Sequence, residues 1–307
     1  MIISASRRTD IPAFYSEWFF NRIKAGFVLV RNPVQRQQVH RIDLSPDVVD
    51  AFVFWTKNPS PMMERLKLLK DYMYYFQYTL NAYGEDIEPN IPVRGMRLHK
   101  FKALSDMIGA DRVIWRYDPI FFTDKYNMEY HIQSFERIAM ILSGYTEKCT
   151  ISFLDFCSSV QKEHLQLPSE EEQLILAKSF AEIGRRYGIQ ICTCAEKLCL
   201  QEFGIQKSSC IDKALLEKLL SCSLNVSKDK GQRSECGCVS SIDIGEYDTC
   251  NNGCRYCYAC HSGQQIIANI RQYDSKSPLL IGNLNQNDII KERKVETLKD
   301  PQIGFKF

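Results

Sequence analysis

Near the carboxyl end of this chain of 307 residues lies the stretch Ile242-Asp243-Ile244-Gly245-Glu246-Tyr247-Asp248-Thr249-Cys250-Asn251-Asn252-Gly253-Cys254-Arg255-Tyr256-Cys257-Tyr258-Ala259. A short apolar segment runs into three cysteines spaced C-x3-C-x2-C, at Cys250, Cys254 and Cys257. Gly253 gives the loop freedom to curl, so the three thiolates can reach three corners of one metal cluster. Cysteine thiolates are the usual ligands of iron–sulfur clusters, and we therefore predict such a cluster here.

The spacing of these cysteines also distinguishes between kinds of metal site. Two repeated C-x2-C pairs are typical of a four-thiolate zinc site, whereas this loop has unequal gaps and an aromatic residue, Tyr256, before its last cysteine. The pattern resembles the signature of the radical S-adenosylmethionine (SAM) enzymes. In that superfamily three cysteines hold a 4Fe–4S cluster whose fourth iron chelates SAM, so the resemblance implies both cofactors. A structural zinc site and reduced cysteines without metal are the alternatives.

The rest of the chain resembles a bacterial and archaeal family catalogued as domain of unknown function 1848 (DUF1848). Four segments carry the resemblance in addition to the cysteine loop: Ser6-Arg7-Arg8-Thr9-Asp10-Ile11-Pro12, Phe54-Trp55-Thr56-Lys57-Asn58-Pro59, Trp115-Arg116-Tyr117-Asp118-Pro119-Ile120 and Cys236-Gly237-Cys238. The family is noted for a C-terminal cysteine cluster like that of the radical SAM enzymes. It has no settled reaction, so the resemblance implies the cluster but no particular substrate.

Composition and charge place the chain among ordinary soluble proteins. It is 45% hydrophobic and 25% charged, and its formal net charge of +2 predicts no large nucleic-acid footprint. No apolar run approaches the roughly 18 residues of a membrane helix, and the first residues lack a signal-peptide pattern. The odd number of cysteines, 13, is untypical of a secreted disulfide scaffold. We therefore expect a metalloprotein in the reducing cytoplasm.

The hydrophobic pattern predicts an α/β fold. Apolar segments rich in β-branched and aromatic residues predict eight strands, at 2–5, 27–30, 51–55, 74–80, 112–116, 150–154, 189–193 and 239–244. Helical patterns lie between most of them, at 12–25, 61–72, 98–108, 130–142, 168–187 and 211–222, and Ser169 with Glu172 forms a capping box. Such alternation over about 260 residues is typical of a (β/α)8 TIM-like barrel.

The expected domain is a single barrel over residues 1–262, and residues 263–307 form a C-terminal extension packed on it. An irregular or incomplete barrel is the alternative, because residues 31–50 show little helical pattern. Radical SAM enzymes carry their three cysteines after the first strand, whereas here they follow the last. Since the eighth strand of a barrel lies beside the first, we predict a barrel that resembles a circularly permuted radical SAM barrel.

Polar residues follow the predicted strands, where barrel enzymes place their chemistry. The candidates for binding SAM or substrate are Arg7, Arg8, Lys57, Asn58, Asn81, Arg116, Asp118 and Glu196. Arg7 and Arg8 would lie beside the cysteine loop, where a guanidinium can bind a carboxylate through two hydrogen bonds. The alternative for the two arginines is a surface ion pair with Asp10, and any single candidate could be a turn or helix cap.

Four further cysteines suggest a second metal site: Cys194, Cys210, Cys236 and Cys238. They follow or precede predicted strands that a barrel would bring together. Four thiolates would fill a closed site holding either a second 4Fe–4S cluster, which we favour, or zinc. The alternative is that they pack as small apolar side chains, as we expect of Cys149, Cys157, Cys192, Cys199 and Cys222. Cys260 and His261 are unassigned.

These features predict an enzyme that cleaves SAM reductively to a 5′-deoxyadenosyl radical, which acts on an unknown small polar substrate. Such an enzyme needs an electron donor such as ferredoxin or flavodoxin. One alternative is a radical-SAM-like enzyme of nucleic-acid repair or modification, against which the balanced charge argues. Another is an iron–sulfur protein of electron transfer or sensing without SAM, or a structural zinc protein.

Overall fold

A computed structural model describes residues 1–155 and 165–300. The strands are β1 (Ile2–Ala5), β2 (Phe27–Arg31), β3 (Gln38–Asp43), β4 (Ala51–Thr56), β5 (Met73–Thr79), β6 (Val113–Ile120), β7 (Lys148–Phe153), β8 (Gln190–Cys194), β9 (Gln206–Ser208), β10 (Ile242–Asp243) and β11 (Ile289–Glu292). The α-helices are α1 (Ile11–Phe14), α2 (Ser16–Ala25), α3 (Ser60–Met63), α4 (Arg94–Ile108), α5 (Met128–Leu142), α6 (Glu170–Tyr187), α7 (Lys213–Leu220) and α8 (Gly263–Arg271). Short 3-10 turns are η1 (Leu66–Leu69), η2 (Ala110–Arg112) and η3 (Gln201–Phe203).

The centre of the molecule is an eight-stranded sheet in the order β10-β1-β4-β5-β6-β7-β8-β9. Every neighbouring pair in it is parallel. Buried side chains dominate β1, β4 and β5, as expected of strands covered on both faces. The predicted α/β class is confirmed, and so is the position of the last predicted strand beside the first.

One predicted strand of the large sheet is wrong. The segment predicted at 27–30 forms β2, which pairs antiparallel with β3 in a second sheet of order β11-β3-β2. The short connection between β2 and β3 permits only a hairpin, since a parallel crossover needs a dozen or more residues. Strands β1 and β4 pair directly, and the eighth strand of the large sheet is instead the edge strand β9, which has three residues of little apolar character and which the sequence pattern did not indicate.

A closed barrel is not confirmed. The strands β9 and β10 stand at the two edges of the large sheet, and no pairing joins them in the parts of the chain described. Even so, both edges contribute to one inner core, in which Val53 of β4 and Tyr75 of β5 pack with Cys210 and Val239. The Tyr75 hydroxyl donates to the Cys210 carbonyl at 2.5 Å. Segments beyond both edges therefore cover the same inner face.

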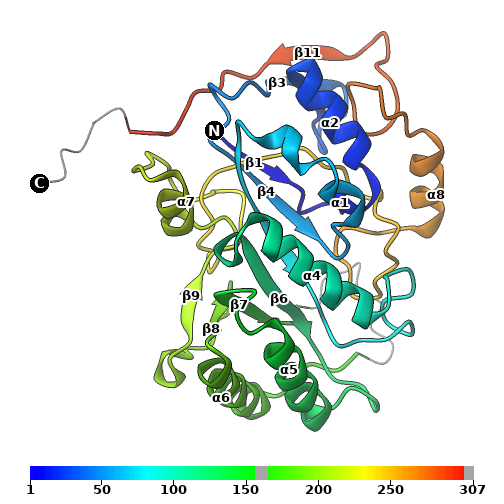
Figure 1. The fold of residues 1–307 in the computed structure, drawn as a ribbon. Helices are drawn as coiled ribbons and strands as arrows, with labels where there is room; N and C mark the ends of the chain where they lie inside the picture. The colour runs from blue at the N-terminus through cyan, green and yellow to red at the C-terminus, as the bar shows by residue number, and fades with distance from the viewer. Residues whose placement is uncertain (156–164, 301–307) are drawn as a thin grey trace, which may run out of the picture.

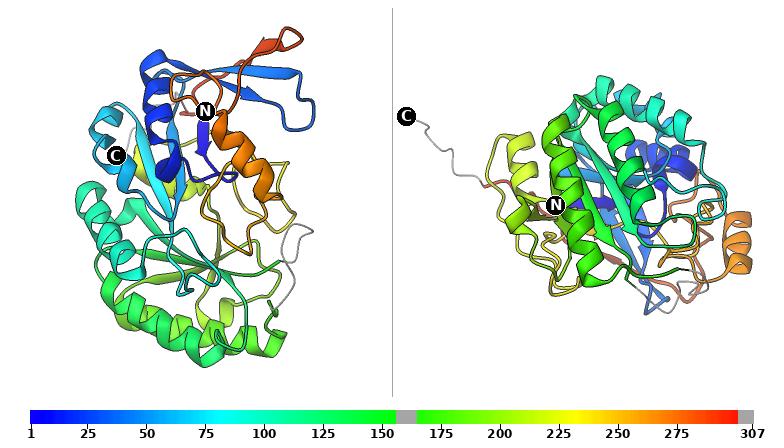
Figure 2. Two further views of the ribbon diagram at one scale, coloured as in Figure 1. Left: turned by 90° about the vertical axis from the view of Figure 1, so that its right-hand side faces the viewer. Right: turned by 90° about the horizontal axis from the view of Figure 1, so that it is seen from below.

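Helices cover the opposite face of the sheet. Figures 1 and 2 show α4, α5 and α6 lying side by side along β6, β7 and β8. Phe135 of α5 stacks on Trp115 of β6 with ring centroids 4.6 Å apart, and on Phe180 of α6 at 4.1 Å. Helix α6 begins at the predicted capping box of Ser169 and Glu172. This large aromatic layer anchors the strands whose carboxyl ends form the site.

The C-terminal residues return to the first half of the chain. Strand β11 pairs with β3, and the indole nitrogen of Trp18 in α2 donates to the carbonyl oxygens of Ser277 and Leu279, each at 3.0 Å. Helix α8 (Figure 1), which the sequence pattern did not indicate, is held to the segment before the cysteines, because Asn269 Nδ2 donates to the Asp248 carbonyl at 2.9 Å. No helix in the described ranges has the length and apolar character that a membrane crossing requires.

Asp243 of β10 joins the edge strand to β1. Its carboxylate accepts hydrogen bonds from Ser4 Oγ at 2.6 Å, Ser6 Oγ at 2.7 Å and the Arg7 amide at 2.9 Å. A fourth comes from the Gly245 amide at 2.9 Å. A Cβ on Gly245 would lie 2.0 Å from Ser6 Oγ, so only glycine lets the two segments approach this closely.

Replacing this carboxylate should loosen the edge of the sheet. An amide in Asp243→Asn has one acceptor oxygen for four donors, so we expect a loss of about 1.5–3 kcal/mol in the free energy of unfolding. Urea denaturation measures the change. Asp47→Asn, at an exposed position, is the control and should be neutral. Equal stability of the two variants would contradict this role of Asp243.

Candidate metal and cofactor site

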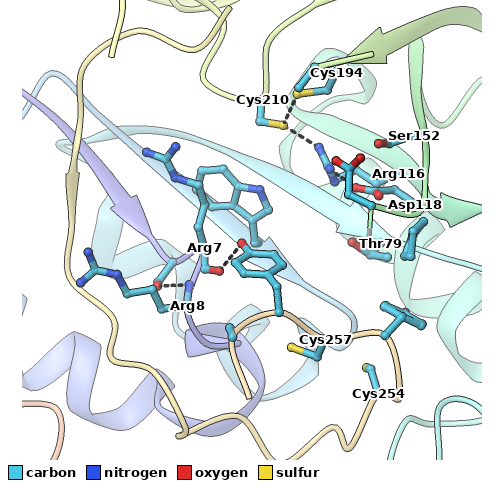
Figure 3. Close-up of a pocket in the computed structure, with 18 of the residues that line it drawn as sticks. Arg7, Arg8, Thr79, Arg116, Asp118, Ser152, Cys194, Cys210, Cys254 and Cys257 are labelled. Carbon is cyan, nitrogen blue, oxygen red and sulfur yellow. Dashed lines mark hydrogen bonds and ion pairs between the residues drawn. The ribbon is translucent and has the colours of Figure 1, made fainter. Parts of the chain in front are cut away.

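A cavity of about 540 Å³ opens at the carboxyl ends of the large sheet. Its walls come from the segments that follow β1, β4, β7 and β8, from the ends of β5 and β6, and from both groups of cysteines. Figure 3 shows Cys254 and Cys257 toward one end of the cavity and Cys194 and Cys210 toward the other. The volume is in the range of small-molecule and cofactor sites. The two predicted cysteine groups thus face one common space.

Five of the eight predicted binding residues line this cavity, namely Arg7, Arg8, Lys57, Arg116 and Asp118. The other three lie behind its wall. Asn58 caps the turn before α3 by accepting from the Ser60 amide. Asn81 is buried and holds the Asp118 backbone, and Glu196 accepts from Ser152 Oγ and the Phe153 amide, each at 2.8 Å.

The cysteine loop places Cys250, Cys254 and Cys257 on the cavity wall. Their three thiols do not lie within 4.8 Å of one another, a spacing compatible with separate corners of a cluster rather than one shared ion. Cys260, which does not line the cavity, donates a hydrogen bond from its thiol to the Cys250 carbonyl oxygen at 3.6 Å. Burial raises the pKa of Cys254 well above its usual range, whereas the contact with Cys260 lowers that of Cys257 to about 7.

The loop keeps its shape through backbone and carboxylate contacts. Gly253 has φ +69°, and a Cβ there would lie 3.0 Å from the ring of Pro89, so the position suits glycine on both counts. Asn252 donates to buried Asp10 at 3.2 Å. Asp10 also caps α1 and accepts from the Lys57 amide at 2.8 Å, and burial raises its pKa. The alternative of an ion pair between Asp10 and Arg7 or Arg8 is therefore wrong.

Glu88 is a central residue that the sequence reasoning did not assign to the site. Its side chain is 1% exposed and accepts from Lys57 Nζ at 2.8 Å, from Arg97 Nη1 at 3.4 Å and from the Tyr256 hydroxyl. Asn81 donates to the same carboxylate at 3.3 Å. Tyr256 of the cysteine loop is thereby tied to the ends of β4 and β5. The sequence places Glu88 after the strand that forms β5, but it does not show that Lys57 and Tyr256, from distant segments, bind this carboxylate.

The second group brings all four predicted cysteines together. Cys194, Cys236 and Cys238 have thiols within 4.8 Å of one another, and Cys210 Sγ lies 3.2 Å from Cys194 Sγ. All four are buried. Contact with the neighbouring thiols lowers the pKa of Cys210 and Cys236 and raises the pKa of Cys194 and Cys238.

Arginines stand beside this group. Arg116 Nη1 donates to Cys210 Sγ at 2.8 Å, and Nη2 pairs with Asp118. Arg7 uses Nη2 for Ser241 Oγ at 2.9 Å and Asp229 at 3.3 Å. Its Nη1 is buried and has no hydrogen-bond partner in the described residues. Such an orphaned donor in a cavity wall is costly unless a ligand or water satisfies it.

The remaining cysteines only partly follow the sequence reasoning. Cys149 and Cys192 are buried, as expected of packing residues. Cys199 is exposed and Cys222 half-buried, so the prediction of buried packing is wrong for Cys199. The reason is that β8 ends at Cys194, and the chain beyond it runs over the surface. Cys157 lies outside the described residues.

The fold and site define a class: an α/β protein with a parallel sheet and a cavity walled by two cysteine groups at its carboxyl end. The family model described as domain of unknown function (DUF1848) matches residues 2–259, and the chain belongs to that family. The match includes both cysteine groups. Comparisons with curated proteins and with solved structures found no match.

The buried Glu88 network should control the stability of the cysteine loop. Glu88→Gln removes the charge between Lys57 and Arg97, and we expect a loss of about 3–5 kcal/mol in the free energy of unfolding. Urea denaturation measures it. Glu85→Gln, an exposed neighbour in the same segment, is the control. If both variants unfold like the parent protein, the network does not hold the loop.

The same substitution should change the pH dependence of stability. Burial alone would raise the pKa of Glu88, but Lys57 and Arg97 outweigh it and the pKa lies below its usual value. The stabilisation is therefore complete above the unfolded pKa of about 4.3 and is lost as pH falls through the folded pKa. Denaturation between pH 6 and 3 should show a smaller acid loss in Glu88→Gln than in Glu85→Gln.

Proposed function

We propose that the protein is a radical-SAM-type iron–sulfur enzyme. Cys250, Cys254 and Cys257 would hold a 4Fe–4S cluster, and SAM would bind in the cavity beside it. The observation that carries the proposal is that these three cysteines line the same 540 Å³ cavity as the charged ends of the strands. When bound and reduced, the cluster supplies the electron that cleaves SAM to methionine and a 5′-deoxyadenosyl radical able to take hydrogen from a substrate.

The order of the strands supports a finer proposal about the fold. We infer that the large sheet is a circularly permuted radical SAM barrel with an open seam between β9 and β10. Strand β10, which leads into the cysteine loop, pairs in parallel with β1 at Ile242 and Asp243. A permutation would move the first strand of the radical SAM arrangement to the end of the chain and leave it in place in space.

The residues of the chain would bind and orient SAM. Arg7 offers a buried guanidinium nitrogen without a protein partner in the described structure, suited to a carboxylate. Lys57, fixed by Glu88 and the Tyr256 hydroxyl, places a cation beside the cysteine loop. Asp118 lies at the far end of the cavity, next to Arg116. Because charges of both signs line the cavity, we propose a small polar substrate, reduced by a ferredoxin- or flavodoxin-like donor.

The first experiment uses protein purified and reconstituted without oxygen. We expect about four irons and four sulfides from the loop cluster, and an electron paramagnetic resonance (EPR) spectrum of the reduced protein that changes when SAM is added. Dithionite with SAM should release 5′-deoxyadenosine. A spectrum indifferent to SAM, together with no 5′-deoxyadenosine, would rule out the proposal.

Substitutions test which residues hold the cluster and which bind SAM. The double variant Cys254→Ser/Cys257→Ser should lose the iron and all SAM cleavage. Cys222→Ser, half-buried and outside the cavity wall, is the control and should keep both. Arg7→Gln should keep the iron and weaken SAM binding about tenfold or more, because a charge-assisted hydrogen bond is lost. Titration of the EPR signal with SAM measures this affinity.

One observation favours a second candidate function, electron transfer without SAM. The Cys260 thiol lies 3.6 Å from the Cys250 carbonyl oxygen and could supply a fourth thiolate, which would leave no iron open for SAM. Cys260→Ser separates the two functions. In the radical SAM enzyme the variant keeps its iron and its SAM-sensitive spectrum. In an electron-transfer protein the variant loses iron, and the parent spectrum ignores SAM.

A further inference from the structure

The compactness of the second cysteine group sets the kind of metal it can hold. The thiols of Cys194, Cys236 and Cys238 all lie within 4.8 Å, and Cys210 is 3.2 Å from Cys194. A tetrahedral ion with sulfur bonds of about 2.3 Å spaces its ligands by about 3.8 Å. A four-iron cluster holds its thiolates at the outer corners of a cube and spaces them much farther apart. The observed spacing therefore suits one ion.

We propose that Cys194, Cys210, Cys236 and Cys238 bind a single zinc ion, in place of the second iron–sulfur cluster expected from the sequence. Four thiolates complete the tetrahedral shell of zinc and leave no position for substrate, so the site is structural. This inference is independent of SAM chemistry, since it concerns other residues and another metal. The two sites would differ in kind, with an open cluster at one end of the cavity and a closed ion at the other.

Positively charged groups lie beside such a site. A zinc ion with four thiolates carries a formal charge of −2. Arg116 donates to Cys210 Sγ at 2.8 Å, and the Ile211 amide donates to Cys238 Sγ at 3.4 Å. Arg7 adds a second positive charge close to Cys238. Hydrogen bonds of this kind to ligating atoms orient them and tune the affinity for metal.

Contacts of the local backbone also hold the proposed ligands in place. The Cys210 carbonyl accepts from Tyr75 at 2.5 Å and from Gln77 at 2.9 Å, which fixes this cysteine against the inner face of β5. Gly237 lets the Cys236–Cys238 segment pass close to β9, because a Cβ there would lie 2.6 Å from Ser209 Oγ. The thiols are therefore held in position by contacts outside the group.

The position of the site indicates what the ion does. Cys194 ends β8 and Cys210 follows β9 at one edge of the sheet, whereas Cys236 and Cys238 precede β10 at the other edge. No strand pairing joins these edges in the described residues. The zinc ion would close the seam and complete the cavity wall. Binding to the folded state alone would add directly to its stability.

The test uses the full chain with the loop cluster removed by Cys254→Ser/Cys257→Ser. Purified without added metal, this protein should contain about one zinc per chain and no acid-labile sulfide. Cobalt substitution should give the absorption bands of a tetrahedral cobalt–thiolate site. About four irons with sulfide in this background, or no metal at all, would overturn the proposal. Failure of the SAM experiment would leave the zinc content unchanged.

Two variants test whether the zinc is bound at the proposed site. In the same background Cys236→Ser should lose the zinc and lower the melting temperature, while the exposed Cys199→Ser should do neither. If Cys236→Ser does not fold, Arg116→Gln replaces it, with the exposed Arg137→Gln as control. We expect a chelator to remove zinc from Arg116→Gln at about 10–100-fold lower concentration. Unchanged zinc binding in both Cys236→Ser and Arg116→Gln would contradict the assignment.

Discussion

The parallel pairing of β10 with β1 is the constraint on which the site depends. Asp243 secures it, because one carboxylate accepts from two serine hydroxyls of the first strand and its loop and from two backbone amides. The family model matches residues 2–259, so Arg7 and Arg8 lie near the start of the matched segment and the cysteine loop lies at its end. The pairing places the two side by side in the cavity wall. Without it the two halves of the cavity wall would not meet.

Buried charged groups around the cavity lie in small networks. Glu88 balances Lys57 and Arg97, and Asp118 with the thiol of Cys210 balances Arg116. Isolated buried ions are costly, so each of these is retained beside groups of opposite charge. These networks fix the directions of the side chains that face the cavity. Arg7 Nη1, a donor on a residue of the cavity wall that has no hydrogen-bond partner among the described residues, is our candidate for binding a ligand carboxylate.

Sequence reasoning was accurate where a local pattern decided the structure. Strand β1 has the predicted bounds, and α6 begins at the capping box of Ser169 and Glu172. It was wrong where two patterns looked alike, because the apolar segment 27–30 suits a hairpin as well as a parallel strand. Strand β9 was missed because three exposed or half-buried residues carry no periodic signal, and its pairing with β8 comes from tertiary contacts.

The sequence by itself determined the α/β class, the family, and the two sets of cysteines that could bind metal, because hydrophobic periodicity and cysteine spacing are local properties. Only the tertiary structure decided that both sets face one cavity, that Cys260 lies against Cys250, and that the second set is compact enough for one ion. Distances between thiols depend on how β8, β9 and β10 approach one another. That approach arises from long-range packing, which no short stretch of the chain encodes.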